Sequence, residues 1–121
     1  MLIRHYVLEF ILGVSREVHP KEFSCHLRGD NDTIEEVIVL PKTVYGNGFS
    51  RIMMNMKPID KTIIGSAHSH PNKSYKPSIQ DLNYFSRFGY VHLIIRYPYK
   101  SIHDVAAYDR DGNRIPIKVI H

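Results

Sequence analysis

Cysteine occurs only once in this sequence of 121 residues, as Cys25. A single thiol cannot form an internal disulfide, and it cannot supply the cysteine cluster of a structural zinc site. A zinc base deaminase, which needs a Cys-x-x-Cys pair, is excluded for the same reason. Any metal must therefore be held by histidines and carboxylates. We expect Cys25 itself to be a small, buried, apolar side chain.

Long apolar runs are also absent from the sequence. The longest candidate, from Tyr6 to Val14, is interrupted by Glu9 and falls short of a membrane-spanning length. The first residues, Met1 to His5, lack the basic start, apolar centre and small cleavage residues of a signal peptide. We therefore expect a cytoplasmic protein with no membrane partner.

Charge of one sign is only mildly in excess, because 16 basic residues face 12 acidic ones and the formal net charge is +4. The basic residues form no dense stretch, and no nucleic-acid-binding motif occurs. Examples are Lys57, Lys61, Lys73, Lys76, Arg87, Arg96 and Lys100. We interpret them as solvated surface charges and predict no nucleic-acid partner. The sequence indicates no particular oligomeric state.

The order of apolar residues predicts one α/β (α+β) sandwich with a mixed sheet and two principal helices. The first helix is predicted from apolar residues at helical spacing, and His19-Pro20 ends it. These residues are Ile3, Tyr6, Val7, Phe10, Ile11 and Val14. A second helix is expected between Ser78 and Gly89, with Leu82, Phe85 and Phe88 on its buried face. Strands are expected at 22–27 (half-buried), 33–40, 50–56, 61–67, 90–97, 105–109 and 114–120.

The most informative stretches are GSAHSHP at 65–71 and PSIQD at 77–81. His68 and His70 are separated by one residue at the end of a strand, so their side chains point to the same side. Asp81 falls in the first turn of a helix, where the helix dipole favours the ionised carboxylate that a metal needs. Two imidazoles and one carboxylate leave a tetrahedral zinc one open position for water, which is the pattern of a catalytic site.

The histidine pair and the pair of Ser78 and Asp81 each have a plainer interpretation as well. Ser78 and Asp81 alone would be read as a capping box at a helix start. A histidine pair alone is more often a surface or core feature than a metal site. The combination of both halves at this spacing favours the metal.

The pattern H-x-H-x7-S-x2-D at residues 68–81 resembles the JAMM signature of MPN domains, and Gly65, Pro71 and Pro77 also match that family's pattern. The signature includes an upstream glutamate, and Pro20-Lys21-Glu22 resembles that element. Residue types alone do not single out Glu22 from the other glutamates of the first half, which are Glu9, Glu17, Glu35 and Glu36.

The resemblance implies a single JAMM/MPN domain over residues 1–121, with the cytidine-deaminase-like fold of MPN domains. It implies one zinc ion per chain, held by His68, His70 and Asp81. It further implies that Glu22 is the general base and then the general acid, and that Ser78 donates a hydrogen bond to the oxyanion.

The implied activity is that of a zinc metalloprotease or isopeptidase. The expected substrate is a ubiquitin-like or sulfur-carrier protein, cleaved at the amide or isopeptide bond after its C-terminal tail. The short chain resembles a minimal, prokaryotic or archaeal, deubiquitinase-like protein. The alternative is a non-catalytic MPN scaffold, although scaffold versions typically lose the metal ligands that are present here. Tyr75, on the loop after the histidines, either lines the substrate channel or is simply exposed.

Overall fold

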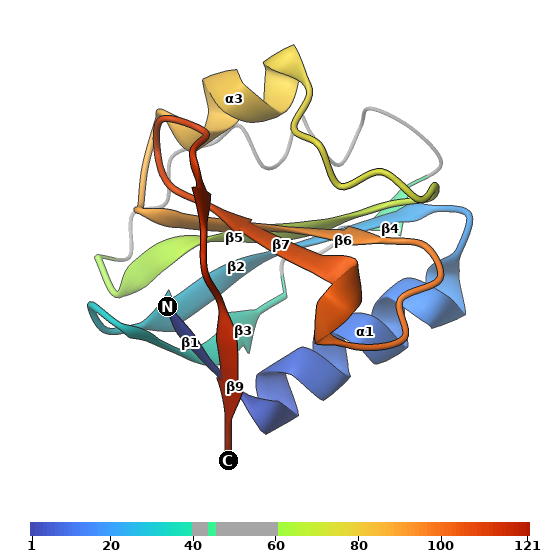
Figure 1. Ribbon diagram of the computed structural model, residues 1–121, viewed down its shortest axis with the longest axis horizontal. Coiled ribbons are helices and arrows are strands. Elements are labelled where there is room, and N and C mark those ends of the chain that lie inside the picture. Colours follow the sequence, from blue (N-terminus) through green and yellow to red (C-terminus); the bar gives the residue numbers. More distant parts are fainter. Residues whose placement is uncertain (40–43, 46–60) are drawn as a thin grey trace.

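A computed structural model of the chain contains a mixed β-sheet between two α-helices (Figure 1). The structure describes residues 1–39, 44–45 and 61–121. The helices are α1 (His5–Val18), α3 (Ile79–Phe85) and the short 3-10 helix η1 (Ile102–Asp104). The strands are β1 (Leu2–Arg4), β2 (Glu22–Gly29), β3 (Thr33–Ile38), β4 (Val44–Tyr45), β5 (Ile63–His70), β6 (Val91–Arg96), β7 (Val105–Tyr108), β8 (Arg114–Ile115) and β9 (Lys118–Ile120). The predicted sandwich of one mixed sheet and two principal helices is confirmed.

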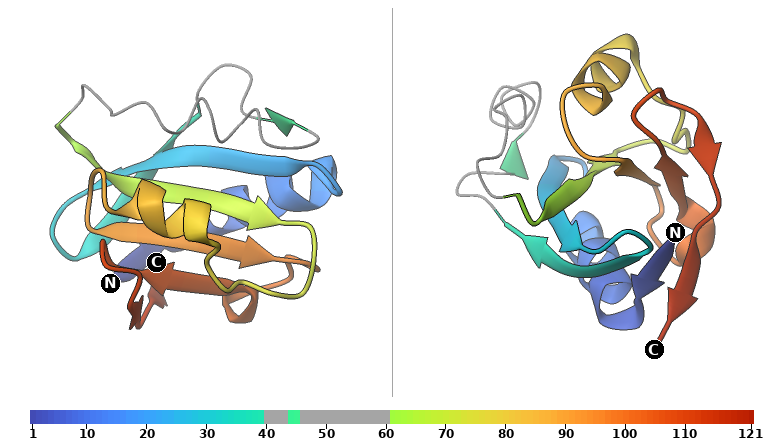
Figure 2. Two further views of the ribbon diagram at one scale, coloured as in Figure 1. Left: turned by 90° about the horizontal axis from the view of Figure 1, so that it is seen from above. Right: turned by 90° about the vertical axis from the view of Figure 1, so that its left-hand side faces the viewer.

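The strand order in the sheet is β8-β7-β6-β5-β2-β3-β1-β9, and β4 pairs with β2. β5 and β6 run parallel and are connected through α3, whereas β2 is antiparallel to both β3 and β5. The sheet curls, with α1 against one face and α3 on the opposite face (Figure 2). The metal-site residues predicted on β5 therefore lie on a central strand.

The N-terminus forms a strand before it forms a helix. Ile3 lies in β1, which pairs in parallel with both β3 and β9. In α1 the buried apolar residues are Val7, Leu8, Ile11 and Leu12. Tyr6 is 59% exposed and Phe10 is exposed as well, so their predicted place on the buried face is wrong. Apolar residues surround most of this helix, and their spacing alone does not select the face that packs.

Strand β2 is buried on both faces rather than half-buried as predicted. Its apolar side chains, including the fully buried Cys25, pack in the core beneath α1. Ser24 and His26 point to the other face and are buried too, and the His26 ring meets the edge of Phe88 at 5.4 Å. Burial raises the pKa of the Cys25 thiol to about 12, so this cysteine stays protonated and unreactive.

The second helix is shorter than predicted. It ends at Phe85, so Phe88 lies beyond it, and Leu82 is 39% exposed instead of buried. The side chains that α3 turns inward are Asp81, Tyr84 and Phe85. Gly89 adopts a φ of +70°, which residues other than glycine rarely adopt, and leads the chain into β6.

The last predicted strand is divided in two. β8 pairs with β7, whereas β9 pairs with β1 at the opposite edge of the sheet. Pro116, between them, has no N–H to donate to a ladder, which explains the break. The strand predicted at 50–56 lies outside the described residues. Neither described α-helix has the length and apolar composition needed to cross a lipid bilayer.

Candidate metal centre and active site

The end of β5 presents His68 and His70 to the face of the sheet that α3 covers. Alternate residues of a strand share a face, and the two Nε2 atoms lie 3.2 Å apart. The helix brings Asp81 to the same point, where Oδ1 lies 3.2 Å from His68 Nε2 and Oδ2 lies 3.4 Å from His70 Nε2. All three side chains are largely shielded from solvent. The structure thus brings together the three residues predicted as metal ligands.

Asp81 is placed by a capping box at the start of α3. Its backbone N–H donates to Ser78 Oγ at 3.1 Å, and the Ser78 N–H donates to Asp81 Oδ2 at 2.8 Å. Burial by itself would raise the pKa of Asp81. The hydrogen bonds of His68 and His70, the charge of His68 and the Ser78 N–H outweigh burial and hold that pKa well below its usual range. The carboxylate is therefore ionised, as a metal ligand must be.

The donor set suits one zinc ion. Neighbouring ligand atoms of a tetrahedral zinc with bonds of about 2.0–2.1 Å lie about 3.3–3.4 Å apart. His68 Nε2 lies 3.2 Å from His70 Nε2 and 3.2 Å from Asp81 Oδ1, which is close to this spacing. His70 Nε2 lies 3.4 Å from the other carboxylate oxygen, Oδ2, and one ligand atom from each residue gives a set within 4.8 Å. His70 Nδ1 donates to the Ser74 carbonyl at 3.1 Å, which leaves Nε2 as the ring nitrogen that would bind a metal in place of a proton. Among the described residues, this group contains three potential ligands and no fourth.

The backbone of His70 is held from a second direction. The buried Tyr99 hydroxyl donates to the His70 carbonyl at 3.2 Å, and His19 Nδ1 contacts the same hydroxyl at 2.9 Å. Arg16 donates to the Tyr99 carbonyl. Tyr99 has a φ of 60°, which is unusual for a large side chain and is maintained here by these contacts.

Glu22 begins β2, on the strand next to the two histidines. In the antiparallel register Ser24 lies opposite His68, and Glu22 shares the face of Ser24 because it is two residues away. Burial raises the pKa of the Tyr99 phenol, and Tyr97 and the Glu22 carboxylate raise it further. Glu22 is half-buried. The predicted general base is thus on the same face of the sheet as the metal ligands.

A buried polar pair joins the segment that follows α3 to the sheet. His92 Nε2 donates to the Phe88 carbonyl at 3.0 Å, so His92 Nδ1 accepts from the Ser66 hydroxyl at 2.7 Å. The His92 ring stacks on Phe85 at 4.4 Å. Burial lowers the pKa of His92 to about 4 and keeps the ring neutral. This pair anchors the helix that carries Asp81.

The sequence did not indicate the groups that support the histidines. Ser74 acts through its backbone carbonyl and Tyr99 comes from a distant loop, so neither residue type carried information. Tyr75, which the sequence left open, is half-buried, and its carbonyl accepts from the Tyr108 hydroxyl at 2.6 Å.

The comparisons with known proteins agree with this geometry. Residues 5–110 match the Prok-JAB family, described as prokaryotic homologs of the JAB domain. A probable metalloprotease from Haloferax volcanii is 36% identical over 115 residues, which cover 87% of this chain and 70% of that protein.

Comparison with solved structures also finds JAB1/MPN and JAMM proteins. A JAB1/MPN domain protein from Archaeoglobus fulgidus has a TM-score of 0.79 and 34% identity, over 100% of both chains. A structure described as a JAMM metalloprotease-like zinc site in the proteasome and signalosome has a TM-score of 0.75 and 33% identity, over 100% of this chain and 98% of the other. A protein from Desulfitobacterium hafniense, 20% identical with a TM-score of 0.65, covers 100% of this chain and 94% of its own and shares the fold alone.

The curled α/β sandwich and its His-His-Asp cluster define a metalloprotease-like zinc domain. The chain belongs to the Prok-JAB family, the prokaryotic homologs of the JAB domain.

Proposed function

We propose that the protein is a zinc-dependent isopeptidase or peptidase that hydrolyses an amide bond with water. The observation that carries this proposal is the convergence of His68, His70 and Asp81 as three ligands, all within 4.8 Å of one another. Three protein ligands with a fourth position open are typical of catalytic zinc, whereas structural zinc has four. When bound, zinc lowers the pKa of water and polarises the carbonyl of the bond to be cleaved. The complete ligand set also argues against the scaffold alternative.

Glu22 serves as the proton carrier in this proposal. Its carboxylate takes a proton from the attacking water and then gives that proton to the departing amine nitrogen. The half-buried position of Glu22 on the face of the ligand histidines supports this role. Glu22 is not one of the proposed metal ligands. A mutation at Glu22 can therefore remove proton transfer while metal binding is kept.

Ser78 stabilises the negative charge that develops on the carbonyl oxygen. Its oxygen already accepts from the Asp81 N–H, which leaves the hydroxyl proton free to donate. The same hydroxyl would therefore cap α3 and bind the oxyanion.

The substrate we propose is a ubiquitin-like or sulfur-carrier protein, cleaved after its extended C-terminal tail in the cytoplasm. The support is the family resemblance of the motif at residues 68–81 and the family match over residues 5–110. A flexible tail can reach a partly shielded centre that a folded domain cannot enter.

Zinc binding is tested by elemental analysis of the purified protein. We expect about one zinc ion per chain, and a large loss in His68→Ala, His70→Ala and Asp81→Ala, because each substitution removes one of three ligands. His103→Ala, at an exposed histidine of η1, is the matched control and should retain the metal. Full zinc content in all three ligand variants would refute the assignment.

Catalysis is tested with a ubiquitin-like protein fused through its C-terminus to a reporter peptide. Glu22→Gln should keep its zinc and lower turnover by about 10²- to 10⁴-fold, because the amide cannot carry a proton. Glu9→Gln, at an exposed position of α1, is the control. Undiminished turnover in zinc-loaded Glu22→Gln would assign the base to another residue.

A further inference from the structure

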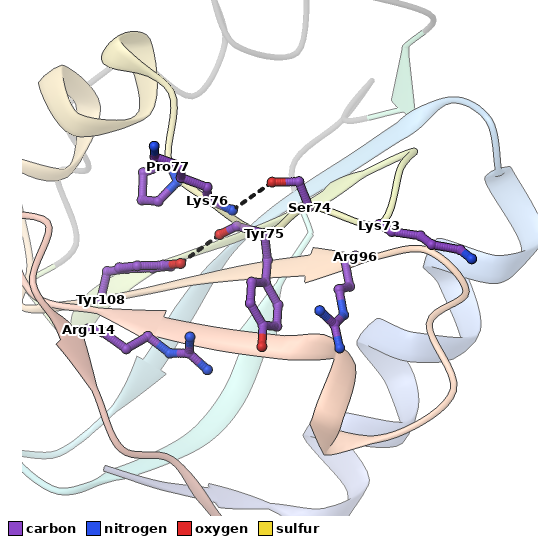
Figure 3. Close-up of a pocket in the computed structure, with 8 residues that line it drawn as sticks. All are labelled: Lys73, Ser74, Tyr75, Lys76, Pro77, Arg96, Tyr108 and Arg114. Atoms are coloured by element: carbon purple, nitrogen blue, oxygen red, sulfur yellow. Dashed lines mark hydrogen bonds between the residues drawn. The ribbon is translucent and has the colours of Figure 1, made fainter.

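A basic groove lies beside the metal centre, with a volume of about 670 Å³ (Figure 3). Volumes of about 300–1,000 Å³ are typical of ligand sites. Four of its lining residues are basic and none is acidic; the full lining is Lys73, Ser74, Tyr75, Lys76, Pro77, Arg96, Tyr108 and Arg114. These basic residues, scattered in the sequence, are gathered by the fold onto one surface, which we call the 73–77 groove.

The 73–77 groove is built on the loop that supports the metal site. Ser74 lines the groove, and its carbonyl accepts the hydrogen bond from His70 Nδ1. Pro77, at the other end of the loop, directly precedes the Ser78 cap of α3. An occupant of this groove would therefore lie next to the bond that the metal centre cleaves.

Tyr75 organises the two arginines. Its ring projects between them, with the Arg96 guanidinium 4.3 Å and the Arg114 guanidinium 4.7 Å from the ring centre (Figure 3). The Tyr108 hydroxyl fixes the Tyr75 backbone. Stacking on an aromatic ring occupies the flat face of a guanidinium and leaves its N–H edges for hydrogen bonds.

Most of the positive charge in the groove is uncompensated. Arg96 donates to Asp104 at 3.1 Å and to the His103 carbonyl at 3.2 Å. Within residues 1–39 and 61–121, no carboxylate pairs with Lys73, Lys76 or Arg114. Carboxylates are the natural partners of such a surface, because an arginine binds them with two parallel hydrogen bonds.

We propose that the 73–77 groove binds an acidic segment of the protein substrate that flanks the cleaved bond. This inference rests on the proposed peptidase function, and it adds a substrate preference that the family resemblance does not contain. A nucleic acid fits the groove less well, because single-stranded bases need a free aromatic face and guanidinium groups already flank the Tyr75 ring.

Binding is tested first, independently of catalysis, by NMR titration of the zinc-loaded, ¹⁵N-labelled protein. The probe is a short peptide of alternating Glu and Gly, and the comparison is the same peptide with Gln in place of Glu. We expect the Glu peptide alone to shift the amide signals of residues 73–76 and of Arg96 and Arg114. Equal shifts with both peptides, or shifts outside the groove, would overturn the proposal. A single-stranded oligonucleotide that binds the same amides more tightly would overturn it in favour of nucleic acid.

The double variant Lys76→Gln/Arg114→Gln removes two of the basic charges of the groove, both at exposed positions. The double variant Lys61→Gln/Arg87→Gln is the matched control, because both residues are exposed and lie outside the groove lining. The groove variant should lose the Glu-peptide shifts, and the control should keep them. Melting curves establish that both are folded, and Arg114→Lys keeps the charge while it removes the stacked guanidinium.

Cleavage is tested with the fusion substrate carrying Glu or Gln blocks on either side of the bond. The wild type should prefer a Glu-flanked substrate by about 2- to 20-fold in kcat/KM, mainly through KM, and the groove variant should lose this preference. Equal cleavage of all substrates would reject the groove and retain the peptidase. Binding of the Glu peptide without cleavage of any substrate would retain the groove as an acidic-peptide site and reject the peptidase.

Discussion

Ser78→Ala separates the capping role that the structure gives to the Ser78 hydroxyl from the oxyanion role that we propose for it. Alanine keeps the backbone N–H that donates to Asp81 Oδ2 at 2.8 Å but removes the oxygen that accepts from the Asp81 N–H at 3.1 Å. One half of the capping box is lost. The expected cost is about 0.5–2 kcal/mol of the free energy of unfolding.

This cost predicts a measurable but small change in melting temperature. Unfolding entropies of about 2.1 cal/mol/K per residue give about 0.25 kcal/mol/K for 121 residues, so each kcal/mol lowers Tm by about 4 °C. Against a total stability of about 5–15 kcal/mol, the variant remains almost fully folded at 25 °C. Any large loss of turnover at that temperature therefore has a chemical cause. The loss of an oxyanion donor predicts about a 10²- to 10³-fold decrease in kcat.

The assay combines melting curves, zinc analysis and kinetics on the fused ubiquitin-like substrate. Ser101→Ala is the matched control, because Ser101 Oγ caps η1 by accepting from the His103 N–H at 3.2 Å, outside the metal centre. It should lower Tm without a change in kcat. If Ser78→Ala also lowers Tm, keeps its zinc and turns over normally, the hydroxyl is a helix cap only and the reasoning about the oxyanion is wrong.

Gly65→Ala should destabilise the protein by several kcal/mol, on the order of other severe core substitutions, because the added Cβ would lie 1.6 Å from the Val91 carbonyl oxygen. Gly13 lies inside α1, where an added Cβ would have only an Arg16 nitrogen near it, at 4.0 Å. Gly13→Ala should therefore raise the free energy of unfolding by about 0.5–1 kcal/mol, and urea unfolding measures the effect of both glycine substitutions. The folded-state pKa of His92, about 4, is below its unfolded value of about 6.5, so the unfolded state takes up the proton first as pH falls. His92 should therefore leave the free energy of unfolding of the metal-free protein unchanged above about pH 6.5. As the pH falls towards 4, protonation of this group should lower that free energy by up to about 3 kcal/mol. His92→Gln should flatten that dependence in urea unfolding, and an unchanged profile would contradict it.

Patterns local in sequence predicted much of the fold. Strands β2, β3, β5 and β6 follow from β-branched and alternating residues between turn residues, and β2 and β3, which are neighbours in the sequence, pair with each other. The positions of Ser78 and Asp81 at the start of a helix were also predictable, because a capping box is a short-range motif. These elements depend on interactions between near neighbours.

Features that depend on distant contacts were not predictable from the sequence. His26 is buried against Phe88, which lies more than 60 residues away in the sequence. The 73–77 groove was missed because its charges come from one loop and from separate strands that carry Arg96 and Arg114. These positions are far apart in the sequence, and no pattern of residue spacing predicts that they meet in the fold.

The metal ligands are divided between a strand and a helix, and this division makes metal loading part of the folding of the chain. α3 has only seven residues, too few to be stable by itself. An ion shared by His70 and Asp81 would act as a cross-link that closes the intervening loop, and cross-links over loops of about this length contribute on the order of 3 kcal/mol. Since that loop also carries Tyr75 and the lysines of the groove, zinc bound at the metal centre would also stabilise the arrangement of the groove.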